Sequence, residues 1–287
     1  MDKAQKIDTH MKGMTIPPSK EVVYDCPIHG IQSYITYLRA DGSWVDAYCP
    51  ECRRIEKERN ALLAEMQSDA KERAVALAHA LHYERPLDFD VPCFSNYEPE
   101  TQEEQHNLAI CRRFAERFTD REIEREKAHN AQEKDWRSKN SLGLLLFGNF
   151  GTGKTHLVYS ILKELDRQGL PGFYITIPDL FDRISDRVNR IDVADVLGKL
   201  GMVSCLVLDE IGVQSGDANE KKRLYQIIDG RIKNGRPTIL VTNLDRSELS
   251  DLLTDRVASR INLSTYRLLF TGRNRREVSV RSAEEVF

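Results

Sequence analysis

The chain has 287 residues, and its 42 lysine and arginine residues against 45 aspartate and glutamate residues give a formal net charge of −3. This length allows one large domain and one small domain. The charge balance excludes a globally basic protein, so any surface for nucleic acid must be local. No apolar run approaches the roughly 18 residues needed to cross a bilayer. The polar N-terminus lacks the apolar segment of a secretion signal, so we expect a cytoplasmic protein without a membrane partner.

The N-terminal part is predicted to contain a flexible tail at 1–20 and a small zinc-binding module at 21–52. The module is rich in aromatic and β-branched residues, and it contains the turn sequence Ala40-Asp41-Gly42-Ser43. Two strands flanking this turn are expected. A unit of this size buries little apolar surface, so a metal ion would supply much of its folding free energy.

Two short motifs in the module, Cys26-Pro-Ile-His29 and Cys49-Pro-Glu-Cys52, have the spacing of paired metal ligands. Three thiolates and one imidazole suit a tetrahedral Zn²⁺ ion in a closed structural site, so no catalysis is expected there. The alternative is four unconnected core residues. The other three cysteines are scattered through the chain, and this pattern favours a reducing compartment and a metal site over disulfides.

A long helix at 53–85 is predicted to follow the module, because Arg53–Leu81 contains no glycine or proline. Its apolar stripe either binds a partner protein or packs on the protein's own C-terminal domain, since a stripe alone does not name its partner. Residues 86–140 are predicted to form a linker, with prolines within 84–99, and a charged helix at 102–139. The stripe comprises Leu63, Met66, Ala70, Ala74, Leu77 and Leu81.

Residues 141–287 are predicted to form an α/β domain. Short apolar runs alternate with helical segments, a rhythm typical of a parallel sheet that is covered by helices on both faces. The sheet should have five strands, at Leu142–Phe147, Gly172–Ile177, Cys205–Leu208, Thr238–Thr242 and Arg267–Phe270.

A complete phosphate-binding motif, G-x-x-x-x-G-K-[ST], directly follows the first of these strands. Its glycines let successive backbone N–H groups face phosphate oxygens, and the next helix adds the positive end of its dipole. Lys154 should reach the β- and γ-phosphates of ATP, and Thr155 should hold Mg²⁺. The alternative is a glycine turn without a ligand. The motif comprises Gly148, Asn149, Phe150, Gly151, Thr152, Gly153, Lys154 and Thr155.

Polar residues end two further strands. Asp209 and Glu210 follow the apolar run that starts at Cys205, and the carboxyl ends of parallel strands are where α/β sheets bind ligands. Asp209 is predicted to support Mg²⁺, and Glu210 to act as general base on the attacking water. Asn243 is predicted to orient that water. An acidic pair can also be a helix N-terminus, and asparagine is a common turn residue.

The order of these motifs resembles the AAA+ ATPases, and most closely the DnaC/DnaI-type helicase loaders and their relatives, the IstB-type transposition ATPases. The resemblance covers about residues 92–276. It is carried by the phosphate-binding motif, by LVLDEIG at 206–212, PTILVTNL at 237–244 and LTDRVASRI at 253–261, and by Phe94-Ser-Asn-Tyr97.

This resemblance implies that Arg260 is an arginine finger acting on ATP held by a neighbouring subunit of a self-oligomer, with Arg256 as an accessory. The alternative is that both arginines pair with nearby acids on a helix face. A sensor-2 arginine is implied among Arg273, Arg275 and Arg276, without a choice between them.

The resemblance also implies single-stranded DNA contact near Arg183, Arg187 and Arg190. The alternative is a solvated face of mixed charge, because Asp182, Asp186 and Asp192 alternate with these arginines. The implied function is ATP-dependent loading of a DnaB-type replicative helicase onto single-stranded DNA. The alternatives are an IstB-like transposition helper ATPase and a nucleotide-gated adaptor. Some loaders of this kind also carry an N-terminal zinc module.

Overall fold

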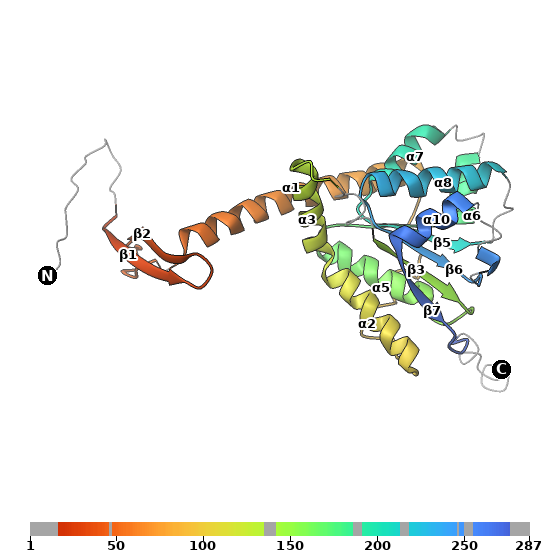
Figure 1. Ribbon diagram of the computed structural model, residues 1–287, viewed down its shortest axis with the longest axis horizontal. Helices are drawn as coiled ribbons and strands as arrows, with labels where there is room; N and C mark the ends of the chain where they lie inside the picture. Colours follow the sequence, from red (N-terminus) through yellow and green to blue (C-terminus); the bar gives the residue numbers. More distant parts are fainter. Residues whose placement is uncertain are drawn as a thin grey trace. The chain divides into compact units, whose positions relative to one another are not determined.

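The computed structural model describes residues 17–45, 48–134, 142–185, 191–212, 218–245, 247–249 and 255–275. The chain divides into two compact units, Met1–Ala64 and Glu65–Phe287. Helix α1, Pro50–Ala80, begins in the first unit and ends in the second (Figure 1). This confirms the long helix predicted in that region. None of the described helices is long and apolar enough to span a membrane.

The first unit is built on an antiparallel hairpin of β1, Ser19–Cys26, and β2, Gly30–Tyr37. The strands turn at Pro27–His29, which is the first metal-ligand motif, and Gly30 supports this turn with φ +69°. The prediction of strands on both sides of Ala40–Ser43 is wrong. Only β2 precedes that turn, and the described residues after it make a single bridge, Leu38 to Trp44. The turn that joins the two strands of the hairpin is therefore the one within the Cys26–His29 motif, and not Ala40–Ser43.

The second unit contains a five-stranded parallel sheet in the order β4-β5-β6-β3-β7. All five predicted strands are confirmed within a few residues. Most residues of β3, β4, β5 and β6 are buried, as expected for strands covered on both faces, whereas the edge strand β7 exposes Tyr266, Arg267 and Leu269. The strands are β3 Gly143–Gly148, β4 Phe173–Thr176, β5 Leu206–Ile211, β6 Thr238–Thr242 and β7 Thr265–Phe270.

Helices connect these strands and cover the sheet. Figure 1 shows α7, α8 and α10 on one side of the sheet and α2 and α5 on the other. Because every connection returns to a parallel strand, all five strands end at the same edge, where the polar motifs lie. The connecting helices are α5 Lys154–Arg167, α6 Ile177–Ser185, α7 Val193–Met202, α8 Ala218–Lys233 and α10 Asp255–Ser264.

Two helices, α2 Gln102–Glu116 and α3 Phe118–Asn130, replace the single charged helix predicted at 102–139. The single-helix prediction is wrong because Arg117, with φ −89° and ψ 1°, leaves the helical conformation and ends α2. The chain then continues as the separate helix α3, in which Phe118 and Ile123 are buried. Residues 135–139 of the predicted helix lie outside the described residues.

The second half of α1, from Glu65 on, belongs to the second unit and packs within it. Met66, Ala70, Leu77 and Leu81 of the predicted stripe are buried, and the last two belong to the main core cluster. Arg183 of α6 donates hydrogen bonds to the carbonyls of Leu81 (3.0 Å) and His82 (2.6 Å), and so satisfies groups that end the helix. The stripe is expected either to bind a partner protein or to pack on the protein's own C-terminal domain. In this part of α1 it packs on the protein's own domain.

Arg231 of α8 is a fully buried cation that clamps three segments together. Its guanidinium donates to the carbonyls of Leu200 (2.6 Å), Val203 (3.0 Å) and Pro237 (2.6 Å), and to the hydroxyl of Thr238 (2.8 Å). Burial lowers the pKa of Arg231 to about 9, so the side chain remains charged at neutral pH. The clamp joins the ends of α7 and α8 to the start of β6.

Replacing Arg231 by alanine should lower the free energy of unfolding by about 3–5 kcal/mol, because it leaves both a cavity and unsatisfied buried carbonyls. Urea unfolding followed by circular dichroism measures this loss. Lys222→Ala, at an exposed position of the same helix, should stay within about 0.5 kcal/mol of the wild type. If Arg231→Ala lowered the free energy of unfolding by no more than Lys222→Ala does, the hydrogen bonds of Arg231 would contribute nothing to stability.

Candidate functional site

The phosphate-binding loop connects the end of β3 at Gly148 with the start of α5 at Lys154. Gly153 has φ +92°, and a Cβ atom there would lie 2.7 Å from Cε2 of Tyr97. Only glycine meets both the backbone conformation and this close approach. The loop thus curls at the N-terminus of a 14-residue helix, which is a ready site for an anion.

Lys154 lies inside this loop. Its side chain is buried, and Nζ donates to the carbonyls of Gly148 (2.8 Å) and Asn149 (2.5 Å). Thr152 closes the loop with a hydrogen bond from its hydroxyl to the Asn149 carbonyl (2.9 Å), whereas Phe150 is 67% exposed. The loop therefore presents a buried ammonium group surrounded by curled backbone, which is an arrangement suited to polyphosphate.

Asp209, near the end of β5, faces the first turn of α5. Its Oδ2 accepts hydrogen bonds from the hydroxyls of Thr155 (3.1 Å) and Tyr174 (3.0 Å), and its Oδ1 accepts one from the backbone N–H of Glu210 (2.7 Å). A hydroxyl and a carboxylate at this separation form a set of hard oxygen donors that fits Mg²⁺. Thr155 and Asp209 would hold the ion.

Glu210 has φ +57°, a left-handed conformation that is uncommon outside glycine and that concentrates at functional sites. The pairing of β5 with β6 is irregular between Leu208 and Ile211, and the side chain of Glu210 is exposed at this irregularity. This backbone conformation interrupts the regular strand at Glu210, so its carboxylate is exposed and accessible to a water molecule.

Asn243 directly follows β6. Because Thr242 pairs with Phe147 in the parallel register, Asn243 lies at the level of Gly148, where the phosphate-binding loop begins. The fold therefore brings the loop, Asp209, Glu210 and Asn243 to one edge of the sheet.

Two segments distant in sequence pack on the loop. The ring of Tyr97 lies edge-on to His156 (5.3 Å between centroids) and beneath the guanidinium of Arg275 (4.7 Å). Arg275 donates its backbone N–H to Gly151 (2.9 Å) and pairs with the buried carboxylate of Glu104 (2.9 Å). Sequence reasoning did not assign Tyr97 a role.

Of the sensor-2 candidates, Arg275 contacts the loop through its backbone. Arg273 pairs instead with Glu100. Arg276 lies outside the described residues.

Helix α10, which carries Arg260, ends beside the edge of the sheet where the strands begin. Nη2 of Arg260, on α10, pairs with Oδ1 of Asp229, on α8, at 3.1 Å, and the arginine side chain is 41% exposed. The pairing with a nearby acid matches the alternative expected for this arginine, although the acid is on a neighbouring helix. The side chain of Arg256 lies outside the described residues.

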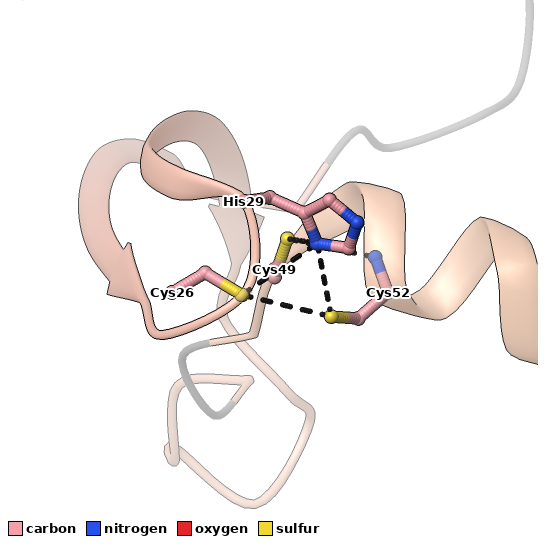
Figure 2. Close-up of side chains that lie close together, drawn as sticks. All are labelled: Cys26, His29, Cys49 and Cys52. Carbon is pink, nitrogen blue, oxygen red and sulfur yellow. Dashed lines mark hydrogen bonds between the residues drawn. The ribbon is translucent and has the colours of Figure 1, made fainter.

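The four predicted metal ligands of the first unit form one cluster (Figure 2). Sγ of Cys26 and Cys52 are 3.6 Å apart, and Nδ1 of His29 lies 3.7, 3.5 and 3.3 Å from the sulfur atoms of Cys26, Cys49 and Cys52. A tetrahedral zinc site requires separations of about 3.8 Å between sulfurs and about 3.6 Å between sulfur and nitrogen. The four residues are not unconnected, and their geometry fits Zn²⁺.

The pKa values of two thiols of this cluster are shifted in opposite directions. Burial and the adjacent sulfur atoms of Cys26 and Cys49 raise the pKa of Cys52. Burial also acts against the Cys26 thiolate, but hydrogen bonds from the backbone of Ile28 and His29 outweigh it and lower the pKa of Cys26. Several thiolates in so small a space need a compensating cation, which a divalent metal supplies.

Comparison with known proteins places the second unit in a family. The family model of the IstB-like ATP binding protein matches residues 113–268. The replicative helicase loader DnaC of Escherichia coli strain K12 is 31% identical over 172 residues, which cover 59% of this chain and 62% of DnaC. DnaC of Buchnera aphidicola subsp. Acyrthosiphon pisum is 29% identical over 173 residues, which cover 59% and 63%. The chain thus spans less than two thirds of these relatives.

Solved structures share the fold. A crystal structure of DnaI superposes with a TM-score of 0.53 at 23% identity, covering 67% of this chain and 94% of that one. A crystal structure of the DnaC helicase loader gives 0.52 at 22% identity, covering 65% and 100%. The sequence-based resemblance is thereby confirmed. The family model covers more than half of the chain, which therefore belongs to the IstB-like ATP-binding proteins and has the AAA+ P-loop ATPase fold.

Proposed function

We propose that this protein is an ATP-dependent loader that places a DnaB-type hexameric replicative helicase on single-stranded DNA. The observation that carries this proposal is the similarity to proteins named replicative helicase loader DnaC, which extends over 59% of the chain. The phosphate-binding loop, Asp209, Glu210 and Asn243, which lie together at one edge of the sheet, support it.

In this proposal ATP binds at the loop of Gly148–Thr155. The ammonium of Lys154 neutralises the β- and γ-phosphates, and Mg²⁺, when bound to Thr155 and Asp209, screens phosphate charge. Glu210 accepts a proton from the attacking water, and Asn243 orients that water. Because Lys154 and Asp209 are both in place, we favour a working ATPase over an adaptor that binds nucleotide without turnover.

The N-terminal module offers a surface for the helicase. In the register of the hairpin, Val23, Ile31 and Ile35 share one face, opposite the buried Tyr34 and Thr36. The three apolar side chains are 54–75% exposed. Clusters of exposed apolar side chains mark protein–protein contact sites. Of the predicted partner-binding helix at 53–85, the part from Met66 on packs within the second unit, so we assign partner binding to the module and to residues 53–64 of α1.

We also propose that the protein contacts single-stranded DNA and forms a self-oligomer. Both proposals rest on the resemblance to the loaders. Arg183 is already engaged by the end of α1 and by Asp179 (2.7 Å). Arg187 and Arg190 lie outside the described residues. We place the protein in the cytoplasm, where its thiols would stay reduced.

The Cys26, His29, Cys49 and Cys52 cluster is proposed to bind one Zn²⁺ ion per chain. Elemental analysis of protein purified without added metal should find about one zinc atom per chain, by the ligand count. Cys49→Ser should lose the zinc and the fold of the first unit, because the ion supplies its folding free energy. Cys111→Ser, at a buried cysteine of α2, should keep the zinc. Wild-type protein without zinc would contradict the assignment.

The partner is tested by affinity capture from a lysate of the natural host, with the full-length chain as bait. The Glu210→Gln variant should hold the ATP-bound form and increase recovery of the replicative helicase. Cys49→Ser should lose that recovery if the module makes the contact. Recovery of a transposase in place of the helicase would support the IstB-like alternative and overturn the loader proposal.

A further inference from the structure

We propose that Tyr174 is a positioning residue that holds the Asp209 carboxylate in the orientation needed for the magnesium–nucleotide complex. The inference rests on the ATP site described above. Tyr174 donates its hydroxyl to Oδ2 of Asp209 at 3.0 Å, and the same oxygen accepts the hydroxyl of Thr155 at 3.1 Å. With the N–H of Glu210 on Oδ1, three donors surround one carboxylate.

The sheet register explains why Tyr174 reaches this oxygen. Tyr174 on β4 pairs with Val207 on β5, and Thr176 pairs with Asp209. Tyr174 and Asp209 are therefore diagonal neighbours on one face, a separation that an aromatic side chain spans. The ring also packs edge-on against Tyr159 of α5, with 4.9 Å between centroids, and both tyrosines are buried. This packing limits rotation of the Tyr174 ring.

The hydroxyl of Tyr174 keeps its proton at neutral pH and can therefore donate to Asp209. Burial raises the pKa of Tyr174, and the negative charge of Asp209 raises it further. A fixed donor favours the ionised carboxylate and restrains its rotation, since hydrogen bonds to charged groups are stronger than those between neutral groups. The Thr155 hydroxyl donates its hydrogen bond to Asp209, so its oxygen would remain available to hold Mg²⁺.

Tyr174→Phe should remove this donor and keep the ring. The expected result is that the Mg²⁺ concentration for half-maximal binding of a fluorescent ATP analogue rises about tenfold, as for loss of one hydrogen bond to a charged group. Binding of the same analogue in EDTA should not change. In the Asp209→Asn background, Tyr174→Phe should have no further effect on Mg²⁺ dependence, because the two residues act as one unit.

Tyr83→Phe is the matched control. Tyr83 packs on Phe173, the neighbour of Tyr174, and both tyrosines line the same groove of about 670 Å³. Its buried hydroxyl has no hydrogen-bond partner among the described residues. This variant should keep the wild-type Mg²⁺ dependence.

Three results would overturn the proposal. An unchanged Mg²⁺ titration for Tyr174→Phe would show that the hydroxyl positions nothing. Equal weakening with and without Mg²⁺ would indicate a purely structural role, as would an undiminished effect in the Asp209→Asn background. If wild-type protein did not bind the analogue at all, the ATP site itself would fail, which is a different outcome from failure of Tyr174 alone.

Discussion

Arg260→Ala should bind ATP about as tightly as the wild type and lose about 10³-fold or more of its assembly-dependent hydrolysis. The physical reason is that a guanidinium group supplied by the neighbouring subunit would neutralise charge that develops at the γ-phosphate in the transition state. ATP affinity survives because this charge is absent from the ground state and because the phosphate-binding loop is untouched.

The position of Arg260 in the fold favours action on a neighbour. Helix α10 ends at Ser264, and β7 begins at Thr265 beside Gly143, the first residue of β3. The end of α10 thus lies at the edge where strands begin, whereas the phosphate-binding loop follows the other end of β3, roughly 17–20 Å away by strand rise. Asp229, the partner of Arg260, lies two residues before Arg231, which clamps the start of β6.

A mixing experiment separates action on a neighbour from action on the same subunit. Arg260→Ala retains a working phosphate-binding loop, and Lys154→Ala retains a working finger, so a mixture of the two inactive variants should regain hydrolysis at mixed interfaces. Arg267→Ala, at an exposed arginine of β7, serves as the control and should stay active. If mixed oligomers form and remain inactive, Arg260 is an ordinary helix-face arginine paired with Asp229.

Lys154→Ala and Glu210→Gln should separate binding from hydrolysis. Lys154→Ala removes the buried counter-charge of the phosphates and should abolish ATP binding at concentrations that saturate the wild type. Glu210→Gln should keep ATP affinity and lower hydrolysis by about 10²–10⁴-fold, because an amide is a poor base. Nucleotide titration and phosphate release measure the two quantities.

Lys163→Ala is the control for the lysine. Lys163 lies on the same helix as Lys154, but its ammonium binds the carbonyls of Asp90 and Pro92. It should keep normal ATP affinity. Equal nucleotide affinity in wild type and Lys154→Ala would contradict the assignment of the loop, and normal hydrolysis by Glu210→Gln would contradict the assignment of the base.

Much of the ATPase unit could be predicted because its signals are local. A strand buried on both faces must be apolar along its whole length, so β3 and β6 stand out between charged helices. The glycines of the phosphate-binding loop and the ligand pairs around Cys26 and Cys49 are close in sequence because each has to close a tight turn. These features needed no knowledge of the register or of the packing.

The interactions that were missed depend on register and packing between distant segments. The sequence shows Tyr174 only as an apolar strand residue, and its contact with Asp209 exists because β4 pairs with β5 in one particular register. The end of α2 at Arg117 likewise depends on how α3 packs. The pairing of Arg260 with Asp229 depends on how α10 packs against α8. The stripe of α1 predicted a buried face without naming what would cover it.

Helicase deposition on a closed circle of single-stranded DNA tests the proposed function most directly, because a ring helicase cannot thread onto a circle from an end. Purified helicase is mixed with coated circles and ATP, and the helicase retained on the DNA is counted after the unbound protein is washed away. Wild-type protein should raise retention well above that of helicase alone, whereas Lys154→Ala should not. Equal retention with wild type, with Lys154→Ala and without either would contradict a loading function.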